Sequence, residues 1–145
     1  MKGCLIFAYN NGTVDYLAMA RWSADNIQRH LGMPTAIVTN TEFVPREYER
    51  CILVEPPATE QKRYFRDHKE AATWYNLNRM SAYDLSPWNQ TLLLDSDYVV
   101  ASDQLSVLFD SGQDFLAHRI ADDASGNLPF KGNESFGAYK MPMYW

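Results

Sequence analysis

Short apolar runs alternate with amphipathic or polar stretches along the first hundred residues of this chain. The runs at 4–9, 35–39 and 51–54 have the length of buried strands, and turn residues follow them. Between the first two runs, apolar residues recur at helical spacing, and Gly32 and Pro34 mark the end of this helix. The members of the stripe are Val14, Leu17, Ala20, Ala24, Ile27 and Leu31. Strand, helix and strand in this order build a parallel sheet.

The rest of the sequence pattern predicts further strands, helices and loops. Thr13 is the expected N-cap of the first helix, with Asp15 in its first turn. The later elements are a loop at 59–67, a helix at 69–83 whose stripe includes Met80, a strand at 91–94, a short helix at 103–109 capped by Ser102, and a strand at 114–119. The chain is therefore predicted to be an α/β protein, with a Rossmann-like, mostly parallel sheet flanked by helices in a single domain over residues 1–145.

Composition and charge narrow the class of partner. The chain has 145 residues, of which 46% are hydrophobic and 21% charged, and its net charge is −5. This composition is typical of a globular protein, and the acidic balance argues against nucleic acid as a partner. Cys4 and Cys51 lie in apolar runs without CxxC spacing, which indicates buried thiols in a reducing compartment and favours a cytoplasmic location. No run approaches the length of a membrane span.

Two carboxylates follow the apolar run that ends at Leu94. Asp95 and Asp97 flank Ser96 at the expected carboxyl end of a strand, where ligands bind in open α/β sheets. Two hard oxygen ligands at this edge suit Mn²⁺ or Mg²⁺ together with a diphosphate. Because Asp-x-Asp also occurs in ordinary turns, a turn that ends the strand remains an alternative. A phosphatase with an aspartate nucleophile is another, although its motif normally follows the first strand of the domain.

Other candidate residues lie near the same expected edge. Tyr9 and Asn10 follow the first strand, where a ring can stack on a base and an amide can bond to its edge, or where both simply form a capping turn. Asn76 and Arg79 lie one turn apart on a predicted helix, from which Arg79 could reach a phosphate or extend into solvent. His118 is a candidate metal ligand or an ordinary half-buried imidazole.

Several of these positions belong to a pattern that resembles a known family. The pattern comprises Asn76-Leu77-Asn78-Arg79-Met80, Tyr83-Asp84-Leu85, the run 91–100 with its Asp-x-Asp, and Leu108-Phe109-Asp110. With a helix, a loop, a strand into Asp-x-Asp and a final Leu-Phe-Asp in this order, the chain resembles GT-A type glycosyltransferases. It is most similar to the retaining family that includes glycogenin and the bacterial galactosyltransferases of lipopolysaccharide synthesis. The N-terminal strand and turn, residues 7–11, fit this family more loosely.

The resemblance implies the GT-A fold and a donor site for a nucleotide-diphospho-sugar. Asp95 and Asp97 would bind Mn²⁺, or Mg²⁺, and the diphosphate. Arg79 would stand near the phosphates or the sugar, where the family often has Lys. Tyr9 and Asn10 would line the nucleobase pocket. Asn76 and Ser96 lie within the matching motifs and complete the expected donor site.

The same resemblance implies that the chain is a donor-binding half. Family members usually run well beyond this length, and their later half binds the acceptor and often adds a His metal ligand. The expected activity is transfer of a hexose from a UDP-sugar to an unknown acceptor, with retention of configuration. A nucleotide-sugar-binding module without catalysis is the alternative, and a metal-dependent phosphohydrolase is a third interpretation. An exposed apolar tail at 141–145 would favour pairing of two copies.

Overall fold

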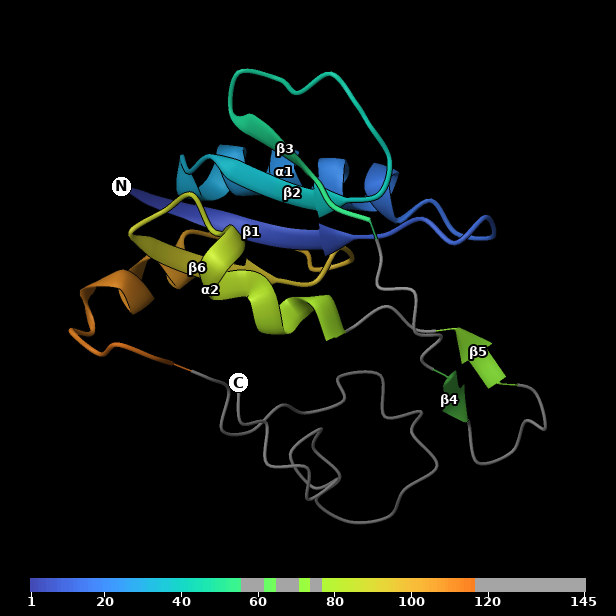
Figure 1. The fold of residues 1–145 in the computed structure, drawn as a ribbon. Helices are drawn as coiled ribbons and strands as arrows, with labels where there is room; N and C mark the ends of the chain where they lie inside the picture. The colour runs from blue at the N-terminus through green and yellow to red at the C-terminus, as the bar shows by residue number, and fades with distance from the viewer. Residues whose placement is uncertain (56–61, 65–70, 74–76, 117–145) are drawn as a thin grey trace, which may run out of the picture. The chain divides into compact units, whose positions relative to one another are not determined.

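The computed structural model describes residues 1–55, 62–64, 71–73 and 77–116, which contain a four-stranded parallel sheet with helices on its faces (Figure 1). The sheet consists of β1 (Lys2–Ala8), β2 (Thr35–Thr39), β3 (Glu49–Leu53) and β6 (Gln90–Leu94), in the order β3-β2-β1-β6. Each strand of this sheet runs parallel to its neighbours. The helix α1 (Tyr16–Leu31) connects β1 to β2. The predicted α/β class with a parallel sheet is therefore confirmed.

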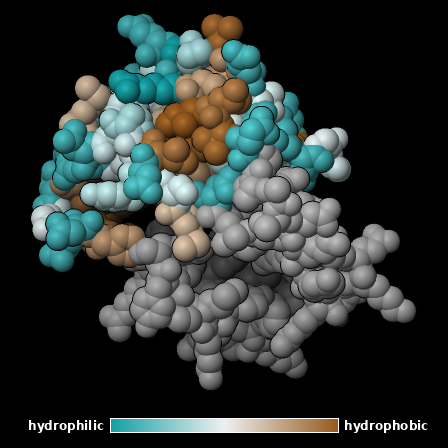
Figure 2. Space-filling view, viewed as in Figure 1, coloured by the Kyte–Doolittle hydropathy of each residue, from teal (hydrophilic) through white to brown (hydrophobic). Residues whose placement is uncertain are grey.

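The central strand β1 supplies side chains to two separate cores. Cys4 and Ile6 belong to the cluster that α1 covers, whereas Leu5 and Phe7 belong to a second cluster with Trp88. In the view of Figure 1, α1 lies behind the sheet and α2 (Ala82–Leu85) in front of it. Figure 2 shows apolar surface on the side that carries the second cluster. Burial on both faces explains why the strand reads as a continuous apolar run.

The helix α1 follows the predicted stripe but begins later than expected. Its buried apolar residues are Leu17, Ala20, Ala24 and Ile27. The N-cap is Asp15, whose carboxylate accepts the Ala18 N–H at 3.0 Å, so the prediction of Thr13 was wrong. The reason is a local turn, because the side-chain oxygen of Asn11 accepts the Thr13 N–H at 3.0 Å and keeps this residue outside the helix. Gly32 ends the helix with a φ of 63°, as predicted.

The predicted helix over 69–83 was wrong. Within it the structure has β5 (Ala71–Thr73), the 3₁₀-helix η1 (Leu77–Ser81) and the start of α2. β5 pairs antiparallel with β4 (Lys62–Tyr64), which lies in the segment predicted to be a loop. Met80, which belongs to the predicted stripe, is 78% exposed and so lies outside the core. Ala82 and Leu85 instead pack against the second cluster.

The segment after β6 agrees only partly with the sequence pattern. The short helix predicted at 103–109 is the 3₁₀-helix η2 (Gln104–Asp110), and the Ser102 hydroxyl accepts the Gln104 N–H at 3.5 Å. Residues 114–116 of the predicted fifth strand are not in a strand, and its remainder lies outside the described residues. The parallel sheet lies in the compact unit Met1–Phe109.

The indole of Trp88 fixes the amino end of β1. Its Nε1 donates to the Cys4 carbonyl oxygen at 3.0 Å. A Cβ atom at Gly3 would lie 2.5 Å from Cε2 of this indole, so the contact requires glycine. Cys4 is buried and Cys51 is partly buried, and both are free thiols. Within the described ranges, no helix combines the length and apolar character needed to span a bilayer.

Candidate functional site

The strand order creates a topological switch point between β1 and β6. From β1 the chain proceeds to β2 and β3 on one side, whereas β6 pairs with the other side of β1. Ligands of open α/β sheets bind at such a point, beyond the carboxyl ends of the strands. Because β1 ends at Ala8 and β6 at Leu94, Tyr9, Asn10 and Asp95 leave the sheet at this edge.

The Asp-x-Asp segment forms a turn that exposes both carboxylates. The Tyr98 N–H donates to the Asp95 carbonyl oxygen at 3.1 Å. Leu94 and Ser96 are buried, whereas Asp95 and Asp97 are exposed. Among the described residues, no three His, Cys, Asp or Glu side chains group closely enough to hold a metal. Two exposed carboxylates still fit Mg²⁺ or Mn²⁺ in a phosphate site, because such ions keep waters and bind phosphate oxygens besides one or two carboxylates.

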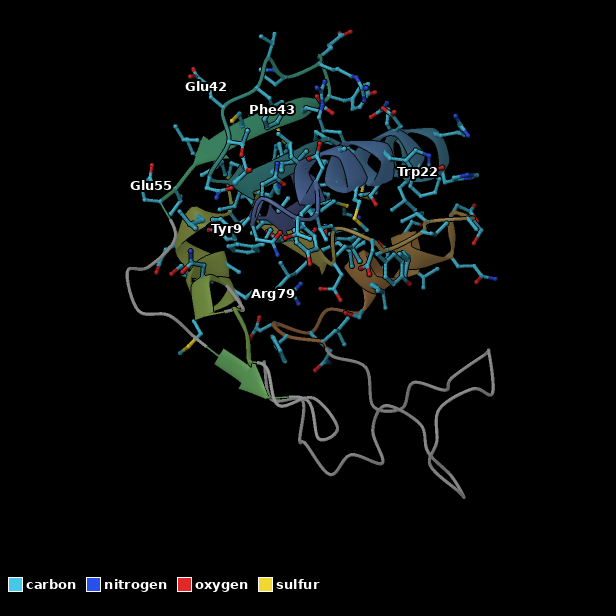
Figure 3. All side chains as sticks on the ribbon, turned by 90° about the vertical axis from the view of Figure 1, so that its right-hand side faces the viewer. Tyr9, Trp22, Glu42, Phe43, Glu55 and Arg79 are labelled. Carbon is cyan, nitrogen blue, oxygen red and sulfur yellow. The ribbon has the colours of Figure 1, made fainter. Side chains whose placement is uncertain are left out.

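Arg79 of η1 supplies a positive charge to this turn. Its guanidinium pairs with the Asp95 carboxylate, which is 55% exposed, while the Arg79 side chain is 23% exposed. The resemblance implied that Arg79 lies near the phosphates or the sugar, on a predicted α-helix, whereas the structure has Arg79 on a 3₁₀-helix and paired with Asp95. Figure 3 shows Arg79 at the same edge of the sheet as Tyr9. This part of the edge therefore combines two acidic side chains with a cation from a different element.

Tyr9 lies at the switch point with its ring in the second core cluster. Its exposed fraction is 6%, and the ring centroids of Tyr9 and Phe7 are 6.3 Å apart. Burial raises the pKa of the Tyr9 hydroxyl, and the neighbouring Asn78 side chain acts in the opposite direction. Asn78 precedes Arg79 in η1, so η1 lies beside the end of β1. Stacking of Tyr9 on a base stays a prediction.

Asn10 organises the turn between β1 and α1. Its side-chain oxygen accepts the Leu17 N–H at 3.0 Å, and its amide nitrogen donates to Asp15 at 3.1 Å. The backbone of Asn10 pairs with the side chain of Asn40, through bonds of 2.9 and 3.0 Å in opposite directions. This pair joins the chain beyond β1 to the residue that follows β2, and sequence reasoning missed it. A contact between Asn10 and a base stays a prediction.

The remaining candidates divide between the turn and the part of the chain that is not described. Ser96 is 8% exposed, and its carbonyl oxygen accepts a hydrogen bond from Ser23 of α1 at 2.9 Å. Asn76, His118 and the tail at 141–145 lie outside the described residues. Ser23 was missed because the pattern marked only the apolar residues of α1. The signal available in the sequence was a polar residue, Ser23, on the apolar face of the predicted helix.

Comparison with known proteins returns no relative for this chain. No protein-family model matches it, and no curated protein or solved structure matches it either. The fold defines an α/β protein with a parallel, Rossmann-like sheet. A more specific assignment depends on the residues at the switch point.

Proposed function

We propose that this chain binds a nucleotide-diphospho-sugar through a divalent metal, as a GT-A type glycosyltransferase or its donor-binding part. One observation carries the proposal: Arg79 and the turn with Asp95 and Asp97 meet at the switch point of the parallel sheet. A diphosphate needs positive charge around its oxygen atoms. Arg79 offers a planar set of N–H donors, and carboxylates can hold a divalent cation. The donor is expected to be a UDP-sugar.

Each residue has a distinct role in this proposal. Asp95 and Asp97 would hold Mn²⁺ or Mg²⁺, which as a Lewis acid would stabilise the charge on the departing diphosphate. Arg79, which pairs with Asp95 in the structure, would contact a phosphate oxygen of the bound donor. The side chains of Tyr9 and Asn78 lie close together, and this contact would keep η1, and with it Arg79, beside the end of β1. With these roles, the diphosphate would be recognised between the ends of β1 and β6.

Calorimetric titration of UDP, with and without Mn²⁺, tests the donor site. Binding should require Mn²⁺ and should be lost in the double variant Asp95→Asn/Asp97→Asn. Glu42→Gln is the matched control, because Glu42 is an exposed carboxylate that lies away from Arg79 in Figure 3. UDP binding that is equally strong without Mn²⁺, or in the double variant, would mean that the Asp-x-Asp only ends the strand.

Turnover separates a transferase from a binding module. A transferase should release UDP from a UDP-sugar in the presence of Mn²⁺, because water can replace the acceptor in a slow hydrolysis. Binding of the UDP-sugar without release of UDP would identify a binding module. Phosphate release from simple phosphate esters, without binding of UDP, would indicate a phosphohydrolase instead.

A further inference from the structure

A fully buried serine connects α1 to the turn that carries the two carboxylates. Ser23 is 0% exposed, and its Oγ lies 2.9 Å from the carbonyl oxygen of Ser96 and 2.9 Å from that of Tyr98. These two carbonyl groups flank Asp97 in the chain. Ser23 follows Ala20 and precedes Ala24 and Ile27, which are also 0% exposed. The Ser23 hydroxyl is thus a polar group in an otherwise apolar contact between α1 and the turn.

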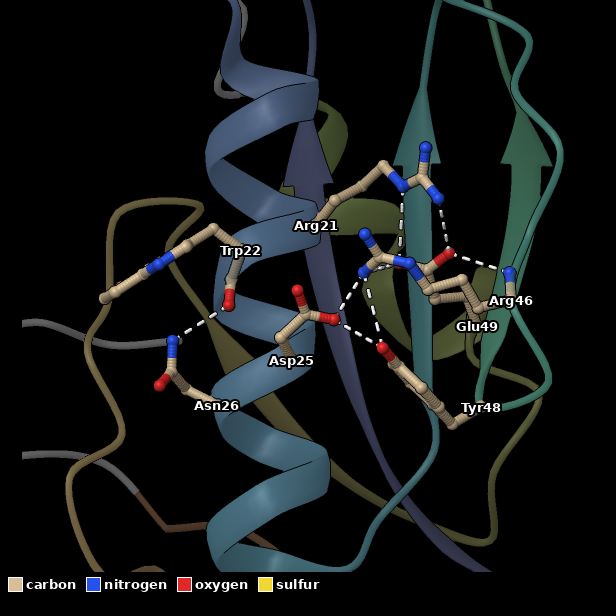
Figure 4. A network of polar contacts seen from close by, with 7 residues as sticks. All are labelled: Arg21, Trp22, Asp25, Asn26, Arg46, Tyr48 and Glu49. Carbon is tan, nitrogen blue, oxygen red and sulfur yellow. Dashed lines mark hydrogen bonds and ion pairs between the residues drawn. The ribbon is translucent and has the colours of Figure 1, made fainter.

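The bonding of Ser23 differs from the usual behaviour of polar residues within helices. Such side chains commonly bond to the carbonyl one turn earlier in their own helix. Asn26 does so, donating to the Trp22 carbonyl oxygen at 2.9 Å (Figure 4). Ser23 instead donates to carbonyls that lie 73 and 75 residues later in the chain. Because a hydroxyl has one proton, the two carbonyls share it.

The Ser23 contact acts on the middle of the turn, whereas other contacts act on its ends. Leu94 and Val100 are buried in the first core cluster on either side of the turn. Loss of the Ser23 hydroxyl would leave a buried carbonyl without this donor, and the peptide groups around Asp97 could then reorient. The direction of the Asp97 side chain depends on those peptide groups.

We infer that Ser23 is a positioning residue for the carboxylates of Asp95 and Asp97, an assignment that rests on the proposed function of this pair. By holding the carbonyls on both sides of Asp97, Ser23 fixes the backbone from which that carboxylate extends. A site formed by two side chains needs its geometry held to about 0.5 Å. Ser23 therefore acts on ligand binding without touching the ligand.

Two variants of Ser23 and one control test this inference. Ser23→Ala removes the hydroxyl, whereas Ser23→Cys keeps a side chain of similar shape with a weaker donor. Ile27→Val is the control, because it removes a methyl group from the same buried face of α1. For each protein we would measure the melting temperature, hydrogen exchange of the Tyr98 amide without ligand, and the affinity for UDP in the presence of Mn²⁺.

Ser23→Ala should accelerate exchange of the Tyr98 amide and weaken binding of UDP with Mn²⁺ by about tenfold, as expected for one lost hydrogen bond. Ser23→Cys should fall between Ser23→Ala and the unmodified protein. Ile27→Val should lower the melting temperature but leave exchange and affinity unchanged.

Unchanged exchange or affinity in Ser23→Ala, or an equal loss of affinity in Ile27→Val, would overturn the inference. If the unmodified protein binds no UDP with Mn²⁺, the proposed function fails. The Tyr98 exchange rates then still decide whether Ser23 holds the turn, so the two failures are distinguishable.

Discussion

Replacement of Arg79 by glutamine tests the arrangement of charges at the switch point. In the structure the Arg79 guanidinium pairs with Asp95, so it would compete with a divalent cation for the same carboxylate. Arg79→Gln keeps a polar side chain but removes this charge. We expect the variant to bind Mn²⁺ alone more tightly, because the competing cation is gone. We also expect it to bind UDP more weakly in the presence of Mn²⁺, because a contact to the diphosphate is lost.

The exposure of the ion pair sets the size of the first effect. The Asp95 side chain is 55% exposed and that of Arg79 is 23% exposed, so solvent screens the pair. Its contribution is then about 0.5–1 kcal/mol, which corresponds to a gain of about two- to fivefold in Mn²⁺ affinity. A hydrogen bond from a charged donor to a phosphate contributes about 1.5–3 kcal/mol, so UDP affinity should fall about 10- to 150-fold.

The assay measures the two affinities separately. Free Mn²⁺ is followed by electron paramagnetic resonance during titration of the protein, and UDP binding is measured by calorimetry at saturating Mn²⁺. Arg50→Gln is the matched control for net charge, because Arg50 belongs to β3 and lies over the Trp88 ring, 4.6 Å from its centroid. A parallel fall of both affinities in Arg79→Gln would refute the competition. Equal changes in Arg50→Gln would assign the effect to net charge.

Further predictions concern the stability of the sheet. Glu49→Gln removes the charge of a fully buried carboxylate that pairs with Arg21 and Arg46 (Figure 4), and should cost about 1–3 kcal/mol in urea unfolding. Asp25→Asn, at a carboxylate that is 36% exposed, should cost less than about 1 kcal/mol, and equal costs would contradict this reasoning. Burial raises the pKa of the Cys4 thiol from 9.0 to about 12, so the unfolded chain loses this proton first as pH rises. The contribution of this thiol to the free energy of unfolding should therefore be fully present below pH 9 and be lost between pH 9 and 12. If the free energy of unfolding falls with pH equally steeply in Cys4→Ala, this thiol is not the cause.

The first half of the fold could be predicted because its signals are local. The apolar run at 35–39 has the bounds of β2, and Gly32 ends α1 where the pattern placed the end. The segment 69–83 contains a helical pattern, but β5 depends on its pairing with β4, which helical periodicity does not report. A helical pattern leads to a stable helix only when the fold supplies a surface for its apolar stripe, and Met80 of this stripe is 78% exposed.

The residues of the candidate site also divide into those with a local signal in the sequence and those whose contacts depend on distant segments. Asp95 and Asp97 could be placed at a strand end because the motif follows the strand directly in the chain. The contacts of Ser23 and Asn40 join segments 73 and 30 residues apart, so nothing near either residue in the sequence indicated a partner. The sequence suggested Arg79 as a phosphate contact, and its ion pair with Asp95 became visible only in the structure.

The backbone and the charge of the carboxylate turn are controlled by different elements. Ser23 of α1 holds its carbonyl groups, and Arg79 of η1 neutralises Asp95. Ser23→Ala and Arg79→Gln each remove one polar contact from this turn, and an ordinary strand ending would respond to both with the same loss of local order. In a preorganised cation site the first should weaken the binding of Mn²⁺ alone, because the carboxylates lose their positions, whereas the second should strengthen it, because the competing cation is gone. Opposite changes in the affinity for Mn²⁺ alone therefore indicate a binding site, and equal changes indicate a turn that only ends a strand.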